Sequence, residues 1–274
     1  MYRTIQYYDD SFNIYIHIDK KSVIDPSTFS DLKALKSVKW IGSKYKVNYG
    51  GRNHLMAYLH LCELALKDDE NTLFHLITGQ DFPCKPMSFF SDLLARHHEV
   101  NYLEWFDLPA PHLNEGGFFR FDYYYLCDWL DKQKHARLIF KIIQLQKTLG
   151  FKRALPKSFK KLYGGSTYWS LNRATISYVM SYTKNYPSFL NRLKHTFCSE
   201  EMYFQTIIMN ADISETIQNS CARFIDWDRK VGASPAYLHE DSFDAIISSD
   251  AFFARKFNTE SSALKDKLID HLKL

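Results

Sequence analysis

The sequence has few cysteines and no long apolar run. Five cysteines stand among 274 residues, and they form neither a CxxC pair nor another spacing typical of a metal site. They are expected to be buried thiols in a reducing compartment. No stretch approaches the roughly 20 apolar residues that a membrane-spanning helix needs. Residues 1–10 are polar and aromatic and do not resemble a signal peptide. The sequence therefore predicts a cytoplasmic location.

Common nucleotide-binding and metal-binding motifs are also missing. The chain contains no P-loop, no GxGxxG and no HExxH. One DxD string occurs at residues 226–228, late in the chain, and we interpret it as accidental rather than as a metal site. His97 and His98 have no third ligand nearby and are expected at the surface. No metal site is predicted.

Acidic residues are absent from one long part of the chain. Residues 132–199 carry 14 Lys or Arg and no Asp or Glu, whereas the rest of the chain carries 21 basic and 31 acidic residues, a net charge of −10. A basic block of this length predicts an anionic partner on one side of the fold. Aromatic residues are interleaved with the basic ones, but no nucleic-acid-binding motif is present, so nucleic acid is not the expected partner.

Hydrophobic residues make up 46% of the chain, enough for a globular protein of one domain with a sizeable core. In the first hundred residues, apolar runs typical of strands occur at 12–18, 38–41, 72–77 and 102–106. Helical patterns lie between them, at 31–38, 52–67 and 87–98. This alternation predicts an α/β sheet with parallel strands. Ligands bind such sheets at the carboxyl ends of the strands, where Asp19 and Asp81 are found.

The second half of the sequence is richer in helical patterns. Helices are predicted at 123–149, 173–183, 186–195, 200–209, 241–247 and 261–272, and short strands at 167–171 and 223–225. Residues 152–161 carry five basic residues around a proline and are expected to form a loop. Ser199 is predicted to cap the helix that follows it.

Three local patterns have both a functional and an ordinary reading. Glu200 and Glu201 are the first acids after the basic block, so one of them could be a general base, although helix capping alone explains acids there. Tyr49 and Gly50 open a helix, where backbone amides favour phosphate, but this is also an ordinary helix entry. Asp19 suits recognition of a nucleotide base or ribose, or is simply a solvated turn residue.

Seven segments, in order along the chain, resemble a known family. They are IYIHIDKK at 14–21, YGG at 49–51, TGQDFP at 78–83, GSTYW at 165–169, EEMYFQTI at 200–207, RFIDW at 223–227 and FARKF at 253–257. Together they resemble the core-2/I-branching β-1,6-N-acetylglucosaminyltransferases, a family that includes peptide O-xylosyltransferases and bacterial relatives.

The resemblance implies a GT-A-type α/β fold with a mostly parallel central sheet flanked by helices. It implies a single domain over residues 1–274, with a UDP-sugar-binding half at 1–110 and an acceptor-binding and catalytic half at 111–274. The implied activity is inverting transfer of GlcNAc, or of xylose, from a UDP-sugar to a glycan hydroxyl. No metal and no other cofactor are implied.

The resemblance also assigns roles to residues of the catalytic half. The family's general base falls on Glu201, and its diphosphate-binding lysine falls on Lys256. A second diphosphate-binding cation of the family has no direct match, and Arg229 or Lys230 is the nearest substitute. The acceptor-stacking tryptophan falls on Trp227, with Arg120 as a second residue on the acceptor side.

On the donor side, the resemblance implies that Asp19, Tyr49, Gly50 and Asp81 contact the nucleotide sugar. Relatives usually carry a strand, a loop and a helix before the segment that matches residues 13–21, and only about a dozen residues precede that segment here. The alternative function is therefore a non-catalytic protein that binds a nucleotide or an anionic glycan. A bacterial enzyme of this kind would meet glycan or lipid-linked acceptors, with peripheral contact at the inner membrane face.

Overall fold

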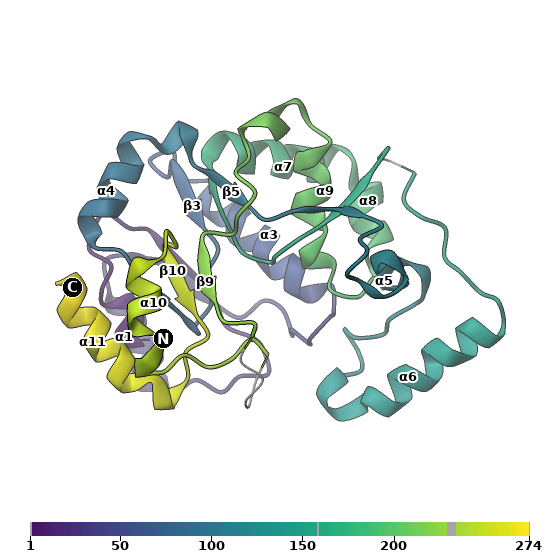
Figure 1. Ribbon diagram of the computed structural model, residues 1–274, viewed down its shortest axis with the longest axis horizontal. Helices are drawn as coiled ribbons and strands as arrows, with labels where there is room; N and C mark the ends of the chain where they lie inside the picture. The colour runs from purple at the N-terminus through teal and green to yellow at the C-terminus, as the bar shows by residue number, and fades with distance from the viewer. Residues whose placement is uncertain (1, 158, 229–233, 274) are drawn as a thin grey trace.

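The computed structural model describes residues 2–157, 159–228 and 234–273, and it combines small sheets with surrounding helices (Figure 1). Two of the sheets in this part of the chain have three strands and two have two. The α/β class predicted from the sequence is confirmed. The division into a donor half and an acceptor half remains a prediction. Strands from both parts of the chain pair within the same sheets.

The N-terminal part forms a parallel strand–helix–strand unit. Strand β1 (Ile14–His17) pairs in parallel with β2 (Val38–Gly42), and helix α2 (Pro26–Ala34) connects them. The sequence pattern placed this helix at 31–38, which is too late. It begins earlier because the Asp25 side chain accepts a hydrogen bond from the Thr28 amide and Pro26 occupies the first turn, two strong start signals.

The two three-stranded sheets join segments that are distant in sequence. In one, β8 (Trp169–Asn172) lies between β3 (Leu73–His75) and β5 (Asn101–Leu103), and both pairings are antiparallel. In the other, β10 (Phe253–Arg255) lies between β4 (Asp81–Pro83), antiparallel, and β9 (Arg223–Ile225), parallel.

The predicted mostly parallel central sheet is not confirmed. Among the described strands, parallel pairing is found for β1 with β2 and for β9 with β10, while the other pairings are antiparallel. These include β6 (Phe106–Leu108) with β7 (Leu162–Gly164). Asp81 was expected in a loop at the end of a strand, but it begins β4, where it is buried beside Arg255 of β10.

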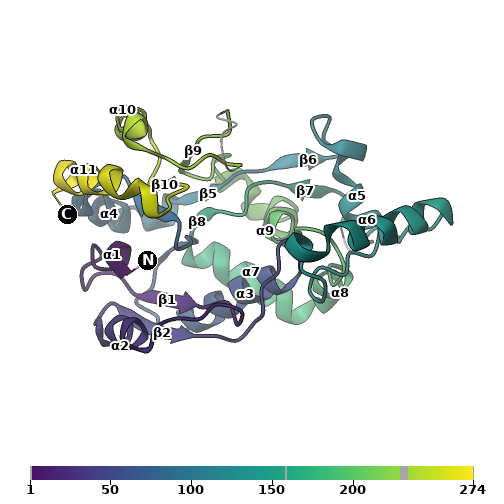
Figure 2. The same cartoon turned by 90° about the horizontal axis from the view of Figure 1, so that it is seen from below.

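Helices cover the sheets on several sides (Figure 2). Their bounds are α1 Tyr2–Ile5, α3 Asn53–Ala65, α4 Met87–Ala95, α5 Phe119–Asp122, α6 Lys132–Thr148, α7 Arg173–Asn185, α8 Pro187–Arg192, α9 Tyr203–Met209, α10 Phe243–Ser248 and α11 Ser262–Leu272. Helix α6 starts nine residues later than the pattern from 123 suggested, since Asp131 caps it. The prediction that Ser199 caps the following helix is wrong. Ser199 instead starts a 3-10 turn, Ser199–Glu201, and α9 begins after that turn.

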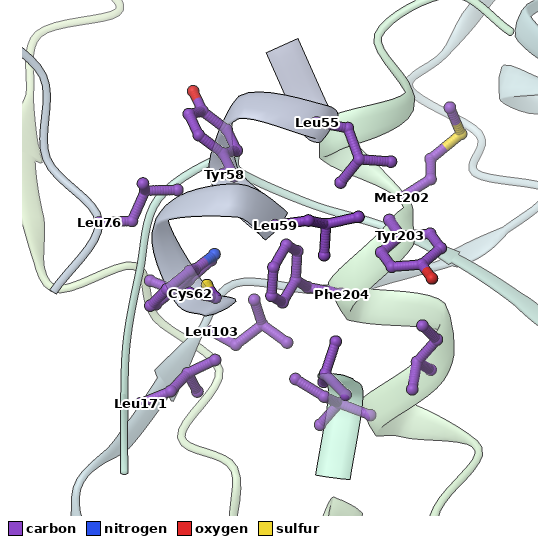
Figure 3. Packing of buried hydrophobic residues seen from close by; sticks show 14 of the residues in the cluster. Leu55, Tyr58, Leu59, Cys62, Leu76, Leu103, Leu171, Met202, Tyr203 and Phe204 are labelled. Atoms are coloured by element: carbon purple, nitrogen blue, oxygen red, sulfur yellow. The ribbon is translucent and has the colours of Figure 1, made fainter. Parts of the chain in front are cut away.

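The largest hydrophobic cluster holds α3 against α9 (Figure 3). Leu55 and Leu59 of α3 face Tyr203 and Phe204 of α9, and all four side chains are buried. Each such burial stabilises the fold by about 1.5–3 kcal/mol. Because Glu201 lies two residues before α9 and the YGG segment ends two residues before α3, this packing fixes two of the family-like segments relative to each other.

All five cysteines are free and buried, which confirms the prediction from their spacing. Within the described residues, no helix combines the length and the apolar character that crossing a membrane requires.

Candidate functional site

Glu201 is the last residue of the 3-10 turn that precedes α9. The turn is entered through Cys198, whose φ of 52° lies in the left-handed region that non-glycine residues rarely adopt. Two backbone hydrogen bonds hold this entry: the Cys198 amide donates to the Gly50 carbonyl at 3.2 Å, and the Glu201 amide donates to the Cys198 carbonyl at 3.1 Å. The backbone is therefore constrained at the residue that carries the candidate base.

The Glu201 carboxylate is paired with Arg120. Arg120 Nη1 lies 2.5 Å from Glu201 Oε2, and the Glu201 side chain keeps 30% of its surface exposed. Burial raises the pKa of Glu201, the Arg120 guanidinium lowers it, and neighbouring Glu200 raises it again, for a net increase over an ordinary glutamate. Glu201 is thus an accessible carboxylate with increased basicity, which suits a general base.

Glu200 is almost fully buried and belongs to a chain of polar contacts. Its Oε1 lies 3.0 Å from His54 Nδ1, and the other ring nitrogen of His54 lies 2.6 Å from the Tyr58 hydroxyl. Burial, the largest single influence, lowers the pKa of His54, but Glu200, Glu201 and Asp19 together raise it above its ordinary value. Within the part of the chain that the structure describes, the Oε2 of Glu200 has no hydrogen-bond partner. His54 and Tyr58, one turn apart on α3, hold the carboxylate that lies next to Glu201.

The Tyr49 and Gly50 segment lies against the entry to the Glu201 turn. Gly50 has φ of 75°, and a Cβ atom there would overlap the Phe197 ring, so both backbone conformation and space require glycine. Tyr49 is 56% exposed, and its ring meets Phe197 edge-on. The ammonium of Lys132, the first residue of α6, lies over both rings at 5.1 and 4.3 Å from their centroids.

Lys256 and Trp227 lie at the same end of the sheet that contains β9 and β10. The two strands are parallel, with Arg255 in register with Ile225, so the residues that follow them emerge at one edge. Lys256 is half-buried and its ammonium lies 5.0 Å from the Tyr237 ring centroid. Trp227 is 63% exposed. The predicted diphosphate-binding and acceptor-stacking residues thus follow neighbouring strands at one edge of this sheet.

Arg255, the neighbour of Lys256, has the opposite environment. Arg255 Nε lies 3.5 Å from Asp81 Oδ1, both side chains are nearly inaccessible, and the guanidinium stacks 4.0 Å from the centroid of the Tyr168 ring. Burial raises the pKa of Asp81, while Arg255 lowers it. Asp81, predicted to bind the donor, is therefore a buried partner of Arg255 within the sheet.

A four-residue segment links the Glu201 turn to β10. The Gly165 amide donates to the Glu201 carbonyl at 2.9 Å, and Tyr168, three residues later, receives the Arg255 guanidinium on its ring. A Cβ atom on Gly165 would overlap the Glu104 carbonyl, so a larger residue does not fit in this close approach. The GSTYW, EEMYFQTI and FARKF segments therefore meet in space.

Asp19 lies in the loop after β1 and is used by that loop. Its Oδ1 accepts hydrogen bonds from the Lys21 and Val47 amides, both at 3.0 Å. Its side chain remains 26% exposed, and Lys21 also pairs with Asp131, the cap of α6. Arg229 and Lys230, the two substitutes predicted for the second diphosphate-binding cation, lie outside the described residues.

Three groups near the base are close enough to share a metal ion. The Cys198 sulfur and one oxygen each from Glu200 and Glu201 lie within 4.8 Å of one another. Their present partners argue for other roles: Glu200 pairs with His54, and Glu201 pairs with Arg120. Burial raises the pKa of the Cys198 thiol far above its ordinary value, which disfavours the thiolate that a metal would need.

Sequence reasoning missed His54, Tyr58, Tyr168 and Lys132 at this site. His54 and Tyr58 are spaced i, i+4 just after the YGG segment, so a shared helix face could have been read from the pattern. The contact of His54 with Glu200 joins residues 146 positions apart and could not have been read from the pattern. Lys132 was counted only as one member of the basic block.

Comparison with known proteins places this geometry in context. The family model described as "Core-2/I-Branching enzyme" matches residues 2–247. A beta-glucuronosyltransferase of Arabidopsis thaliana is 36% identical over 123 residues, 44% of this chain and 28% of that protein. Xylosyltransferase 1 of Mus musculus is 24% identical over 270 residues, 92% of this chain and 26% of that protein, and xylosyltransferase 1 of Homo sapiens is 24% identical over 276 residues, 94% and 27%. The chain thus spans less than a third of the length of these curated relatives.

Proposed function

The chain belongs to the Core-2/I-branching enzyme family, and we propose that it is an inverting, metal-independent glycosyltransferase that moves a sugar from a UDP-sugar to an acceptor hydroxyl. The observation that carries this proposal is the environment of Glu201: a partly exposed carboxylate of raised pKa, on a constrained turn, at the position of the family's base. The seven ordered segments named above support a GT-A-type fold with a donor half before residue 110 and a catalytic half after it.

Glu201 would accept the proton of the acceptor hydroxyl while that oxygen attacks the anomeric carbon. The new bond forms on one face of the sugar as the bond to the diphosphate breaks on the other, so one base suffices and the configuration inverts. Arg120 counteracts the effect of burial and favours the ionised carboxylate that accepts a proton. Arg120, predicted on the acceptor side, is therefore also proposed to position Glu201.

The departing UDP takes the electrons of the broken bond and gains charge. In the proposed mechanism Lys256 neutralises that charge from the end of β10, as fixed cations can do in place of a metal. Arg229 is the proposed second cation. Asp81 contributes indirectly on this view, since it holds Arg255 and thereby the strand that ends in Lys256.

For the donor we propose UDP-GlcNAc first and UDP-xylose second, with Asp19, Tyr49 and Gly50 on the nucleotide side. The relatives are named as xylosyltransferases and glucuronosyltransferases, so the sugar varies among similar chains. Exposed Trp227 offers a flat apolar face for an acceptor sugar. The proposed acceptor is a glycan or a lipid-linked glycan met at the inner face of a membrane by a cytoplasmic protein.

A panel of UDP-sugars tests this function. The protein, freed of metal with EDTA, is offered UDP-GlcNAc, UDP-xylose and UDP-glucuronate, and UDP release is measured with and without candidate glycans. We expect release from at least one donor, at a rate that EDTA does not change. Activity that disappears in EDTA would refute the metal-independent mechanism. Calorimetric binding of UDP with no release from any donor would instead favour the alternative, a non-catalytic nucleotide-binding protein.

A further inference from the structure

Helix α6 buries one apolar side and exposes a second. Ile139 and Ile143 pack inward with Tyr123, Phe197 and their neighbours. Leu138, Leu145 and Leu149 are instead 47%, 59% and 72% exposed. Their spacing of seven and four residues places them on one side of the helix and its C-terminal cap. Burying one stripe explains how α6 attaches to the protein, but it leaves the second stripe unexplained.

The exposed stripe continues past the helix and is mixed with cations. Phe151 and Leu155 follow in the next coil, each 41% exposed. Lys141 stands one helical turn from both Leu138 and Leu145, and Lys157 lies further along the coil; both are exposed. We call the residues Leu138, Lys141, Leu145, Leu149, Phe151 and Lys157 the α6 ridge. Residues 132–199 contain no acid, and the acids that reach this region in space, Glu115 and Asp122, pair with Lys147 and Lys152, which are not ridge residues.

A cationic recess adjoins the end of the ridge. It is an open cavity of about 640 Å³ whose lining includes Phe151, Lys152, Lys157, Arg153 and Arg192, and no carboxylate side chain among the described residues, although Lys152 pairs with Asp122 at 3.1 Å. Arg153 and Arg192 hydrogen-bond to backbone carbonyls rather than to an acid. Burial, and then the neighbouring Arg192, lower the pKa of Arg153 to about 10. An anion in the recess would meet the guanidinium groups of Arg153 and Arg192, which donate hydrogen bonds to backbone carbonyls.

The chemistry of the ridge selects among possible partners. A second copy would bring the same positive charge against itself, and a nucleic-acid backbone would use the cations but gain nothing from exposed leucines. A bilayer with anionic lipids uses both, because apolar side chains enter the boundary of the acyl region while Lys and Arg meet the phosphates. Both views show α6 at the edge of the molecule, where a flat surface could reach it (Figures 1 and 2).

The same helix is tied to the candidate site. Lys132 at its start lies over Tyr49 and Phe197, and its cap Asp131 pairs with Lys21 at 3.3 Å. The helix is 17 residues long, about 25 Å. A membrane bound at the far end of α6 would therefore lie about one helix length, roughly 25 Å, from the site that a lipid-linked acceptor has to reach.

We propose that the α6 ridge docks this protein onto the surface of an anionic phospholipid bilayer, with phosphate groups entering the cationic recess. The docking rests on the exposed leucines and cations alone. Only its consequence, delivery of a lipid-linked acceptor, rests on the proposed function.

Flotation of the full chain with lipid vesicles tests the docking. Vesicles of phosphatidylcholine alone are compared with vesicles that also contain phosphatidylglycerol, and we expect binding only to the second. A ridge variant with Leu145→Ser and Leu149→Ser should bind at least about tenfold more weakly, since it loses most of the apolar burial of two leucines. A recess variant with Lys152→Gln and Lys157→Gln should lose binding as well.

Leu94→Ser is the matched control, because Leu94 lies on α4 and is 42% exposed. Circular dichroism checks that each variant is folded, and donor hydrolysis should be the same in the ridge variant as in the parent.

Three results would overturn the proposal: no vesicle binding, equal binding to neutral vesicles, or an equal loss of binding in Leu94→Ser. A dimer that the ridge variant abolishes would also overturn it, by assigning the ridge to a second copy. Vesicle binding without any donor hydrolysis would leave the docking intact and reject only the enzymatic function.

Discussion

Glu201 lies between two charged groups that act on its proton in opposite directions. Arg120 favours the ionised carboxylate, whereas buried Glu200, held by His54, disfavours it. With burial added, the pKa of Glu201 is above the ordinary value for glutamate. The residue therefore accepts a proton more readily than an exposed glutamate would, at the cost of being protonated at a less acidic pH.

The pH profile should report this balance. A protonated Glu201 cannot accept a proton, so the acidic limb of kcat/KM should lie above the pH expected for an ordinary glutamate. Arg120→Met removes the group that lowers the pKa, and should move the limb to higher pH. Glu200→Gln removes a group that raises it, and should move the limb to lower pH.

Glu63→Gln serves as the control for these profiles, since Glu63 is an exposed residue of α3. Its acidic limb should coincide with that of the parent protein. Shifts of the same sign in Arg120→Met and Glu200→Gln, or no shift in either, would contradict the roles assigned to these two neighbours.

At the scale of single elements, the end of β10 carries a buried structural cation followed by the cation proposed to bind the diphosphate. Arg255 points to buried Asp81 and Tyr168, while Lys256, the next residue, is half-buried near Tyr237. The two neighbouring cations therefore have different surroundings: Arg255 is buried in the sheet, whereas Lys256 lies beside Tyr237.

Two substitutions should therefore differ in what they change. Arg255→Met leaves the Asp81 carboxylate buried without its partner, and should lower the free energy of unfolding by about 3 kcal/mol. Lys256→Met should change that free energy by no more than about 0.5 kcal/mol, but weaken UDP binding at least about tenfold. Denaturant titration and calorimetry measure the two quantities. If Lys256→Met binds UDP as tightly as the parent, Lys256 is not the diphosphate ligand.

Local patterns predicted several elements well and failed at others for physical reasons. The pattern at 52–67 predicted α3, and the run at 38–41 predicted β2, because periodicity and β-branched content are local properties. Pairing direction is not local: β3 and β8 are antiparallel partners that lie about a hundred residues apart. Ser199 resembled a cap in sequence, but left-handed Cys198 redirects the chain into a 3-10 turn.

The candidate site divides in the same way. Glu201 and Lys256 were named from ordered segments, which carry the family's chemistry in sequence. His54 and Tyr58 were not named, because their role depends on α3 packing against α9, which brings them to Glu200. Asp81 was given a ligand role because a carboxylate after a strand is typical of one, whereas the structure uses it inside a sheet.

Over the whole molecule, the charge asymmetry of the sequence corresponds to a separation of tasks. The carboxylates of the candidate site follow the basic block directly, and Lys256 lies well beyond it. Within the block, α6 connects the candidate site with the exposed surface. Lys132 at its start lies over Phe197 beside the site, while the leucines of the α6 ridge are exposed. The two proposals together have this protein bind two anions, a nucleotide diphosphate at one place and a lipid surface at another.

The rate of UDP-sugar turnover by Glu201→Gln, measured in EDTA, tests the central claim most directly. The change keeps the size of the side chain and removes its ability to accept a proton. We expect turnover to fall by roughly 10²–10⁴-fold, with calorimetric affinity for UDP within about twofold of the parent. Turnover by Glu201→Gln that matches the parent protein would contradict the assignment of Glu201 as the base.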